Sequence, residues 1–209
     1  MFISVEGGEG VGKSDFTDKL TNYVKSHLSK QVFKTREPGG SPTSEKIRSI
    51  FNEPVAQDPL KNVTELFLIS ASRYQHVESQ IRPRLKAGEW VICDRYIDSS
   101  RVYQGTLGGV EESVLEYIIK VSTNSLLPHL TFLLDCRPEV VSQRLRDRSQ
   151  QQNSGASRYD EASLETHVQM RQAYLDLARK FPKRIRVINT ERDRELILAE
   201  AIQVLKEYM

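Results

Sequence analysis

Five short apolar runs alternate with longer amphipathic stretches along the chain, and this alternation predicts its secondary structure. The short runs are rich in β-branched residues and are bounded by polar or turn residues, which is typical of strands. They cover residues 2–6, 31–35, 90–94, 130–135 and 185–189. The third and fourth runs are almost continuously hydrophobic, so we expect burial on both faces, as in a parallel sheet.

The longer stretches between these runs have the length and spacing of helices. The predicted helices cover residues 13–29, 43–52, 61–86, 110–123, 137–148, 159–180 and 192–208. In the stretch 159–180, apolar residues recur at helical spacing. They are Leu164, Val168, Tyr174, Leu175 and Ala178. Alternation of strand and helix predicts an α/β layered fold with right-handed crossovers, in a single domain over residues 1–209.

Composition and charge narrow the classes of function. The 30 basic and 28 acidic side chains leave a formal net charge of +2, which gives no electrostatic reason to expect nucleic acid or membrane as a partner. No run is long enough to cross a bilayer, and no charged leader precedes the first strand. Cys93 and Cys136 end or follow apolar runs and belong to no metal-ligand spacing. We therefore expect a cytoplasmic protein.

Residues 7–14 read GGEGVGKS and fit the phosphate-binding pattern G-x-x-x-x-G-K-[ST], called the P-loop below. Glycines let successive backbone N–H groups point at an anion, and the start of the next helix adds its positive dipole end. Lys13 is expected to reach the β- and γ-phosphates, and Ser14 to place its hydroxyl on Mg²⁺. The ligand predicted by this motif is ATP or a similar triphosphate with Mg²⁺. The candidate ATP-binding residues are Gly7, Gly8, Glu9, Gly10, Val11, Gly12, Lys13, Ser14 and Asp15.

Several arginines point to a second anion site opposite the first. The predicted strand 90–94 ends in Asp94, and Arg95 follows it. Ligands of doubly wound sheets bind beyond the carboxyl ends of strands. Asp94 is therefore expected to face the metal and Arg95 to face a phosphate. Arg36 and Arg48 flank a Pro-Gly-Gly turn and are candidates to hold an anionic acceptor, while Arg73 offers a planar fork to a ligand edge.

The chain resembles the bacterial thymidylate kinases over nearly its whole length. The matching motifs are EGGEGVGKS, REPGG, DRY, SS..YQG, and an arginine-bearing segment followed by R.AYLDLA. The resemblance implies a three-layer P-loop fold with a five-stranded parallel sheet flanked by helices. It also implies transfer of the γ-phosphoryl group of ATP to dTMP, giving dTDP and ADP for dTTP biosynthesis, by an enzyme that is usually a homodimer.

The resemblance assigns roles to individual residues of this chain. Arg95, Arg36 and Arg48 would surround the acceptor phosphate, and Arg73 would hydrogen-bond the thymine carbonyl. The other residues with an implied acceptor contact are Glu9 near the 3′-hydroxyl and metal, Ser100 and Gln104 near the base, and Tyr103 against the sugar. In a lid segment at about 144–160, Arg148 and Arg158 would close over the transferred group. Lys13, Arg95, Arg148 and Arg158 are thus the candidate catalytic residues, and Ser14 and Asp94 the candidate metal ligands.

Three features depart from the family pattern. Asp15 stands where the family usually has Thr or another uncharged residue, and its charge is expected to weaken ATP binding modestly. Ile69 stands where Phe usually stacks on thymine, so it can cover the base without offering a π-face. The polar stretch 149–157 makes the lid longer than the family commonly shows.

Two alternatives remain open from the sequence. The first is another nucleotide or nucleoside kinase of the same fold, which the substitution at Ile69 leaves possible. The second is a P-loop protein that binds nucleotide without transferring phosphate to a small molecule. A screen of monophosphate acceptors with ATP and Mg²⁺ separates these alternatives from dTMP kinase activity.

Overall fold

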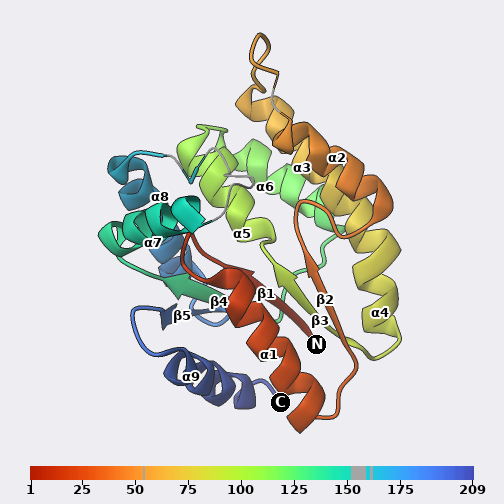
Figure 1. Ribbon diagram of the computed structural model, residues 1–209. Helices are drawn as coiled ribbons and strands as arrows, with labels where there is room; N and C mark the ends of the chain where they lie inside the picture. Colours follow the sequence, from red (N-terminus) through yellow and green to blue (C-terminus); the bar gives the residue numbers. More distant parts are fainter. Residues whose placement is uncertain (54, 152–158, 161) are drawn as a thin grey trace.

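The computed structural model describes residues 1–53, 55–151, 159–160 and 162–209. Its five strands form one parallel sheet in the order β2-β3-β1-β4-β5, flanked by helices (Figure 1). The strands are β1 (Phe2–Glu6), β2 (Val32–Arg36), β3 (Trp90–Asp94), β4 (Leu130–Asp135) and β5 (Ile185–Asn189). The predicted fold class is confirmed, and β2 differs from its predicted bounds by one residue.

The helical segments follow the strands in alternation. They are α1 (Lys13–His27), α2 (Pro42–Asn52), α3 (Asn62–His76), η1 (Val77–Ile81), α4 (Arg82–Lys86), α5 (Ile97–Ser100), η2 (Arg101–Leu107), α6 (Glu112–Thr123), α7 (Pro138–Gln151), α8 (Leu164–Lys180) and α9 (Arg194–Lys206). Among the described helices, none combines the length and the apolar character needed to span a membrane.

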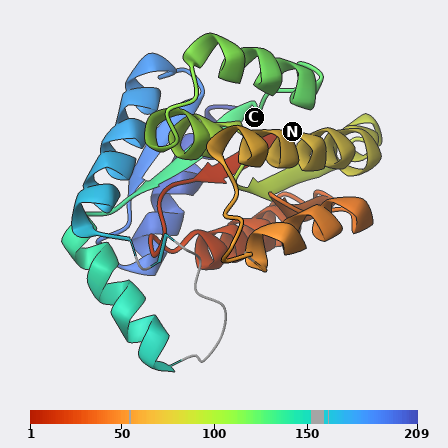
Figure 2. The same cartoon turned by 90° about the horizontal axis from the view of Figure 1, so that it is seen from above.

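Helices cover both faces of the sheet, which gives three layers (Figure 2). On one face, Phe16 and Leu20 of α1 and Ala201 of α9 pack against the central strands. On the other face, Leu66 of α3 and Ile119 of α6 do the same. Strands β1 and β3 are consequently buried on both sides, which explains the nearly continuous hydrophobicity of residues 90–93.

The strand register brings the carboxyl ends of three strands together. Val5 and Arg36 both pair with Asp94, so the carboxyl ends of β1, β2 and β3 meet at one edge of the sheet. The P-loop leaves β1 at this edge, and the loops after β2 and β3 leave it beside the P-loop. The motifs that are far apart in the sequence therefore share one side of the molecule.

Residues 61–86 are predicted as one helical stretch, and the structure divides them into α3, η1 and α4. The segment runs without a break, but η1 widens it by a π-type turn between α3 and α4. Residues 97–107, for which no helix is predicted, form α5 and η2.

Helix α8 starts five residues later than predicted and buries a different face. Ser163 caps it, since its hydroxyl accepts a hydrogen bond from the Thr166 backbone N–H. Leu164 and Val168 are each 48% exposed, so two of the predicted apolar positions do not face the core. The buried residues of α8 are His167, Met170, Ala173, Tyr174 and Ala178.

Candidate functional site

The P-loop wraps between β1 and α1 with a backbone that glycine accommodates. Gly7, Gly10 and Gly12 have φ angles of 137°, 67° and 92°, in the region that favours glycine. A Cβ atom at Gly7 would lie 2.6 Å from the Leu134 carbonyl oxygen, so any larger residue there would push the loop off β4. The Lys13 Nζ folds back and donates to the Gly8 carbonyl at 2.5 Å.

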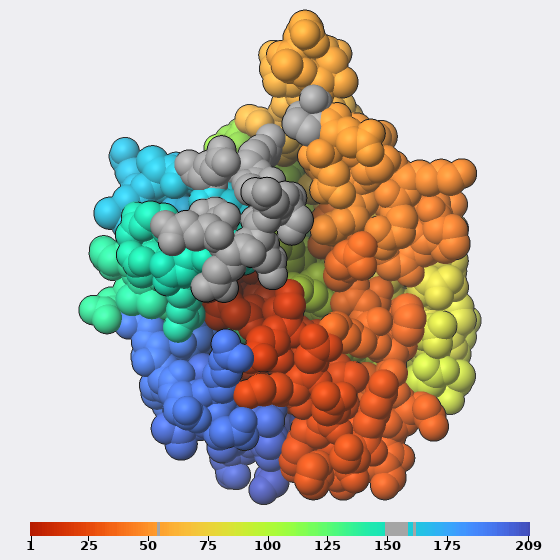
Figure 3. All heavy atoms as spheres, in the orientation of Figure 1, coloured from red at the N-terminus to blue at the C-terminus, as the bar shows by residue number. Residues whose placement is uncertain are grey.

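A cavity of about 680 Å³ opens over the P-loop and the strand ends. Figure 3 views this face of the molecule, which is hollowed between the red P-loop region and the orange region that contains α2. The cavity lining includes the candidate residues Glu9, Gly10, Val11, Gly12, Lys13, Ser14, Asp15, Arg36, Arg48, Asp94, Arg95 and Arg148. Its volume falls within the usual range for ligand sites, so one cleft has room for a nucleotide.

Arg95 is the centre of a network of contacts at the base of this cleft. Its Nη1 donates to the Gly7 carbonyl at 3.0 Å, the Ser99 hydroxyl at 3.2 Å and the Tyr174 hydroxyl at 3.3 Å. Its Nη2 forms an ion pair with Glu9 Oε1 at 2.8 Å. The guanidinium is thereby fixed between the P-loop, α5 and α8, facing the cavity.

Glu9 is kept ionised by its neighbours. Burial alone would raise the pKa of its carboxyl group, but the charges of Arg95 and Lys13 and the Tyr103 hydroxyl bring it down to about 2. The Tyr103 hydroxyl donates to Glu9 Oε1 at 3.0 Å. Burial and the Arg95 charge lower the pKa of Lys13 to about 8. A bound phosphate would stabilise the charged form of Lys13.

Asp94 and Ser14 both line the cavity and offer hard oxygen ligands. Asp94 Oδ1 is buried and has no hydrogen-bond partner among the described residues. A buried acceptor without a donor is costly unless a ligand satisfies it, and carboxylate and hydroxyl oxygens suit Mg²⁺. These two residues therefore fit the metal expected from the sequence.

Arg36 and Arg48 reach the same cavity from β2 and α2. Arg36 Nη2 pairs with Glu45 Oε2 at 2.8 Å, and the other Glu45 oxygen accepts the Gly40 backbone N–H at 2.8 Å. Arg48 Nη1 donates to the Pro38 carbonyl at 2.8 Å. Both guanidinium groups keep further donors for an anion.

Arg73 lies deeper, in a separate buried region, and most of its donors are used. Its Nε donates to Glu37 Oε2 at 2.7 Å, and its Nη2 donates to the Tyr96 carbonyl at 3.2 Å and to the Ser100 hydroxyl at 3.0 Å. Nη1 is buried without a partner among the described residues, as is Gln104 Oε1, one helical turn after Ser100. This region thus holds an unpaired donor and an unpaired acceptor.

Ile69 lies one turn before Arg73 on α3 and is partly buried. Phe67 is 59% exposed and lies away from this region, as expected from its helix position. Arg148, at the end of the cavity, is half-exposed and pairs with Asp160 at 2.5 Å. Arg158 and most of the predicted loop 149–157 lie outside the described residues.

Asp15 has a partner that the sequence did not indicate. Arg194, at the start of α9, lies 3.5 Å from the Asp15 carboxylate, and both residues line the cavity. The carboxylate is therefore partly neutralised before any nucleotide binds. An ion pair between α1 and α9 could not be read from residues so far apart in the chain.

Glu6, Ser99 and Tyr174 also belong to the site, although the sequence analysis assigned them no role. Glu6 accepts the Tyr96 backbone N–H at 2.7 Å and the Ser99 hydroxyl at 2.6 Å. The Ser99 and Tyr174 hydroxyls lie 3.0 Å apart and both contact Arg95. The sequence offered one indication that Glu6 belongs to the site, which is its position as a charged residue at the end of an apolar strand.

The sequence and the fold are similar to those of known proteins. A model of the family described as thymidylate kinase matches residues 5–201. The thymidylate kinase of Symbiobacterium thermophilum is 39% identical over 209 residues, which cover 100% of this chain and 94% of that protein. The thymidylate kinase of Latilactobacillus sakei is 36% identical over 205 residues, 98% of this chain and 94% of that one. A crystal structure of thymidylate kinase from Ehrlichia chaffeensis matches with a TM-score of 0.77 at 28% identity, covering 98% of each chain.

Proposed function

The chain belongs to the thymidylate kinase family, which are ATP-dependent phosphotransferases, and from this premise we propose how its own residues transfer the γ-phosphoryl group of ATP to dTMP. ATP is the phosphate donor and a nucleoside monophosphate is the acceptor. The assignment of individual residues to donor, acceptor and metal is the content of the proposal.

The unpaired donor and acceptor near α3 carry the proposal for the acceptor base. The buried Arg73 Nη1 needs an acceptor, and the buried Gln104 Oε1 needs a donor. Thymine presents an O4 acceptor beside an N3–H donor, whereas cytosine presents a donor and an acceptor at the equivalent positions. Thymine provides a hydrogen-bond partner for both groups. With cytosine, the Arg73 donor would face a donor and the Gln104 acceptor would face an acceptor.

Charge neutralisation carries the proposal for the transfer step. Two polyanions must approach in line, and the protein mainly positions them and stabilises the developing charge. Lys13 and the P-loop N–H groups hold the donor phosphates, while Arg95, with Arg36 and Arg48, holds the acceptor phosphate. Arg148 and Arg158 add positive charge from the lid. No general base is required, because the acceptor phosphate oxygen is already ionised near neutral pH.

Mg²⁺ belongs to the proposal as well, held by Ser14 and Asp94. The ion would neutralise charge on the donor phosphates when bound. The support from this chain is the buried Asp94 Oδ1, which lacks a donor among the described residues and lines the same cavity as Ser14.

Glu9, Tyr103 and Ile69 are proposed to hold the acceptor nucleoside. The ionised Glu9 would accept a hydrogen bond from the 3′-hydroxyl of the sugar. Tyr103, which bonds Glu9, would limit the space beside the sugar. Ile69 would cover the base through apolar contact alone, since it has no ring to stack on thymine.

We also propose that the enzyme is a cytoplasmic homodimer. Exposed apolar side chains on α3 and α6 support self-association: Val63, Phe67, Tyr74, Val114, Tyr117 and Val121, called the apolar face below. The two helices lie side by side and contact each other (Figure 2). Both cysteines are free and buried, which fits a reducing compartment.

An acceptor screen tests the proposed function. ADP release would be measured with ATP, Mg²⁺ and each of dTMP, dUMP, dCMP, AMP and GMP. We expect the highest kcat/KM for dTMP, a lower value for dUMP, and a value for dCMP lower by at least ~100-fold, because its base edge mismatches two buried groups. Comparable kcat/KM values for dCMP and dTMP would contradict the assignment of Arg73 and Gln104. ATP binding without phosphorylation of any acceptor would contradict the activity itself.

A further inference from the structure

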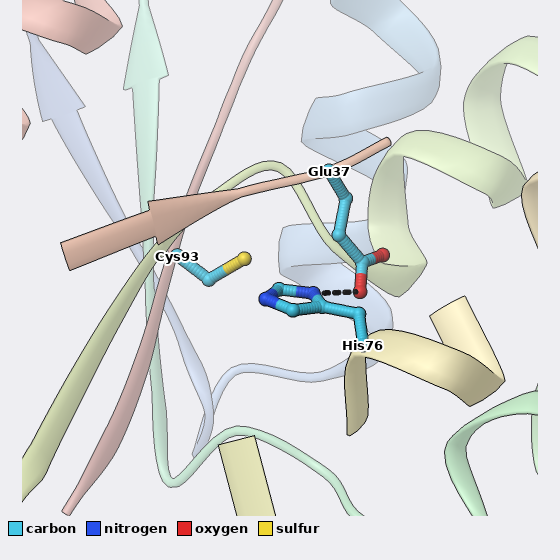
Figure 4. A group of neighbouring side chains, drawn as sticks. All are labelled: Glu37, His76 and Cys93. Atoms are coloured by element: carbon cyan, nitrogen blue, oxygen red, sulfur yellow. Dashed lines mark hydrogen bonds and ion pairs between the residues drawn. The ribbon is translucent and has the colours of Figure 1, made fainter. Parts of the chain in front are cut away.

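A chain of buried polar side chains lies behind Arg73. Glu37 bonds Arg73 Nε through Oε2 at 2.7 Å and faces His76 Nδ1 with Oε1 at 3.1 Å. The other ring nitrogen, Nε2, lies 2.8 Å from the Thr35 hydroxyl oxygen. His76 is completely buried and Glu37 is 4% exposed, so water does not compete for these bonds. Figure 4 shows the His76 ring with one nitrogen directed at Glu37.

The contacts of Glu37 place one proton of this chain. Glu37 accepts from Arg73 and, when ionised, has no proton of its own to give, so His76 Nδ1–H is the donor between them. Burial would raise the pKa of Glu37, but Arg73 and His76 together hold it below its usual range. The Thr35 hydroxyl contacts the other ring nitrogen, Nε2. Thr35 therefore helps to keep Nδ1 directed at Glu37.

The polypeptide packs tightly around the ring. Gly40 has a φ angle of 82°, and a Cβ atom there would lie 2.3 Å from His76 Nε2 and 2.5 Å from Thr35 Oγ1. Gly40 thus allows the loop after β2 to close over His76 and holds the ring in one orientation. A ring fixed in this way can orient the groups bonded to it.

The same residues are of types that bind metal ions, but the contacts favour a different role. Ligand atoms of Glu37, His76 and Cys93 lie within 4.8 Å of one another. Each already has a partner: Glu37 pairs with Arg73, both His76 nitrogens are bonded, and the Cys93 thiol donates to the Arg95 carbonyl at 3.1 Å. A cation bound here would have to displace these bonds beside the positive charge of Arg73.

We propose that His76 is a positioning residue for recognition of the acceptor base: it locks the plane of the Glu37 carboxylate, and Glu37 in turn locks the Arg73 guanidinium so that Nη1 faces the base. This inference rests on the proposed function. With His76 on one oxygen and Arg73 on the other, the carboxylate cannot rotate without losing a buried hydrogen bond. The remaining Arg73 nitrogen, Nη2, is held by Tyr96 and Ser100. Nη1 is then the guanidinium nitrogen that remains available to the substrate.

The test compares two substitutions that differ in one donor. In His76→Asn, the side-chain amide N–H occupies nearly the place of Nδ1–H and keeps the bond to Glu37. In His76→Leu, the volume is similar but the donor is gone. For each protein, kcat and KM would be measured with dTMP and with 4-thio-dTMP, in which a weakly accepting sulfur replaces O4 while N3–H remains.

The ratio of kcat/KM for dTMP to kcat/KM for 4-thio-dTMP reports the bond from Arg73 to O4. We expect a ratio of roughly tenfold in the wild-type protein, the size of a hydrogen bond to a charged group. In His76→Leu the ratio should fall to near one, with a rise in KM for dTMP of roughly tenfold or more and an unchanged KM for ATP. His76→Asn should keep most of the wild-type ratio.

Thr35→Val supplies a second, isosteric test if His76→Leu does not fold. It removes the hydroxyl that holds Nε2 of the His76 ring in place, so the ratio should fall in the same direction by a smaller factor. If all variants keep the wild-type ratio, or if His76→Asn and His76→Leu lose it equally, the proposal is wrong even where activity drops. A wild-type protein that does not phosphorylate dTMP would instead contradict the proposed function, which the acceptor screen detects separately.

Discussion

Arg95 shows how a single residue carries both backbone strain and charge. Its φ angle is 64°, in a region that is unfavourable for a residue with a Cβ atom. The Arg95 backbone N–H donates to the Val5 carbonyl at 2.9 Å, and the next N–H, of Tyr96, donates to Glu6. These bonds hold the turn that directs the guanidinium back over the P-loop.

Removing either main cation of the site should slow turnover. We expect Lys13→Ala and Arg95→Ala each to lower kcat by at least ~100-fold, because each removes charge stabilisation from the transfer step. Steady-state kinetics with dTMP and ATP measure this effect. Arg179→Ala is the control, since Arg179 is an exposed arginine of α8 that pairs with Asp176 and does not line the cavity. A near-normal kcat in Lys13→Ala or Arg95→Ala would contradict their roles.

The carboxylate of Asp15 should still disfavour ATP. Arg194 lies 3.5 Å away but is 73% exposed, and an exposed ion pair offsets the repulsion only in part. Asp15→Thr is therefore expected to lower the KM for ATP by a few fold, and Arg194→Ala to raise it. Both values would be measured at saturating dTMP. An unchanged KM in Asp15→Thr would mean that the carboxylate turns away from the nucleotide.

At the scale of elements, the end of β1 joins the P-loop to α5. Glu6 is fully buried there and supports Tyr96 and Ser99, which lie just before and within α5. Burial, with repulsion from Asp98, raises the pKa of Glu6 to about 7. The structure thus holds an acid at its centre whose ionisation opposes folding near neutral pH.

This acid predicts a pH dependence of stability with a defined sign. Between the unfolded pKa near 4.5 and the folded value of about 7, the folded state binds more protons, so Glu6 makes the protein less stable as pH rises through that window. His167, whose pKa is lowered chiefly by burial, acts in the opposite sense. The wild-type protein and Glu6→Gln should therefore be compared directly by thermal melts between about pH 5 and about pH 8.

We expect the melting temperature of the wild-type protein to fall with pH relative to that of Glu6→Gln. The glutamine keeps an acceptor for the Tyr96 N–H and can donate to the Ser99 hydroxyl. Glu195→Gln, at a carboxylate that is 80% exposed, serves as the control and should follow the wild-type curve. Parallel curves for wild type and Glu6→Gln would show that Glu6 stays neutral or stays charged throughout.

At the scale of the whole molecule, the cleft and the apolar face are separate surfaces. The cleft lies over the P-loop and the strand ends, while the apolar face is formed by α3 and α6. Helix α3 connects them, because Arg73 and His76 lie on its buried side and Phe67 and Tyr74 on its exposed side. Covering the apolar face in a dimer would also fix the helix that presents Arg73.

A charge placed on the apolar face should separate the proposed dimer. Tyr117, on α6, is 69% exposed, so Tyr117→Glu should leave the fold intact while placing two like charges near each other across a symmetric interface. Sedimentation equilibrium would then report the monomer mass. Leu196→Glu, at a residue of α9 that is 58% exposed, is the matched control and should remain dimeric. A monomeric wild-type protein would contradict the proposal.

The sequence by itself determined the order of strands and helices along the chain and the identity of the P-loop. Short apolar runs predict the strands, because a strand buried on both faces must be apolar throughout. The glycines and Lys13 are recognisable because phosphate binding by backbone needs those residues at that spacing. Local signals of this kind do not depend on which segments meet in space.

Tertiary structure alone decided how distant residues combine. Glu37 bonds Arg73, His76 bonds Glu37, and Thr35 bonds His76 in turn, which joins the end of β2 to α3. Arg194 meets Asp15 only because α9 packs beside α1. The π-type turns η1 and η2 depend on packing, and the late start of α8 depends on capping. Neither follows from the periodicity of apolar residues. Such contacts follow from the path of the chain around the sheet. The spacing of residues along the sequence does not reveal that path.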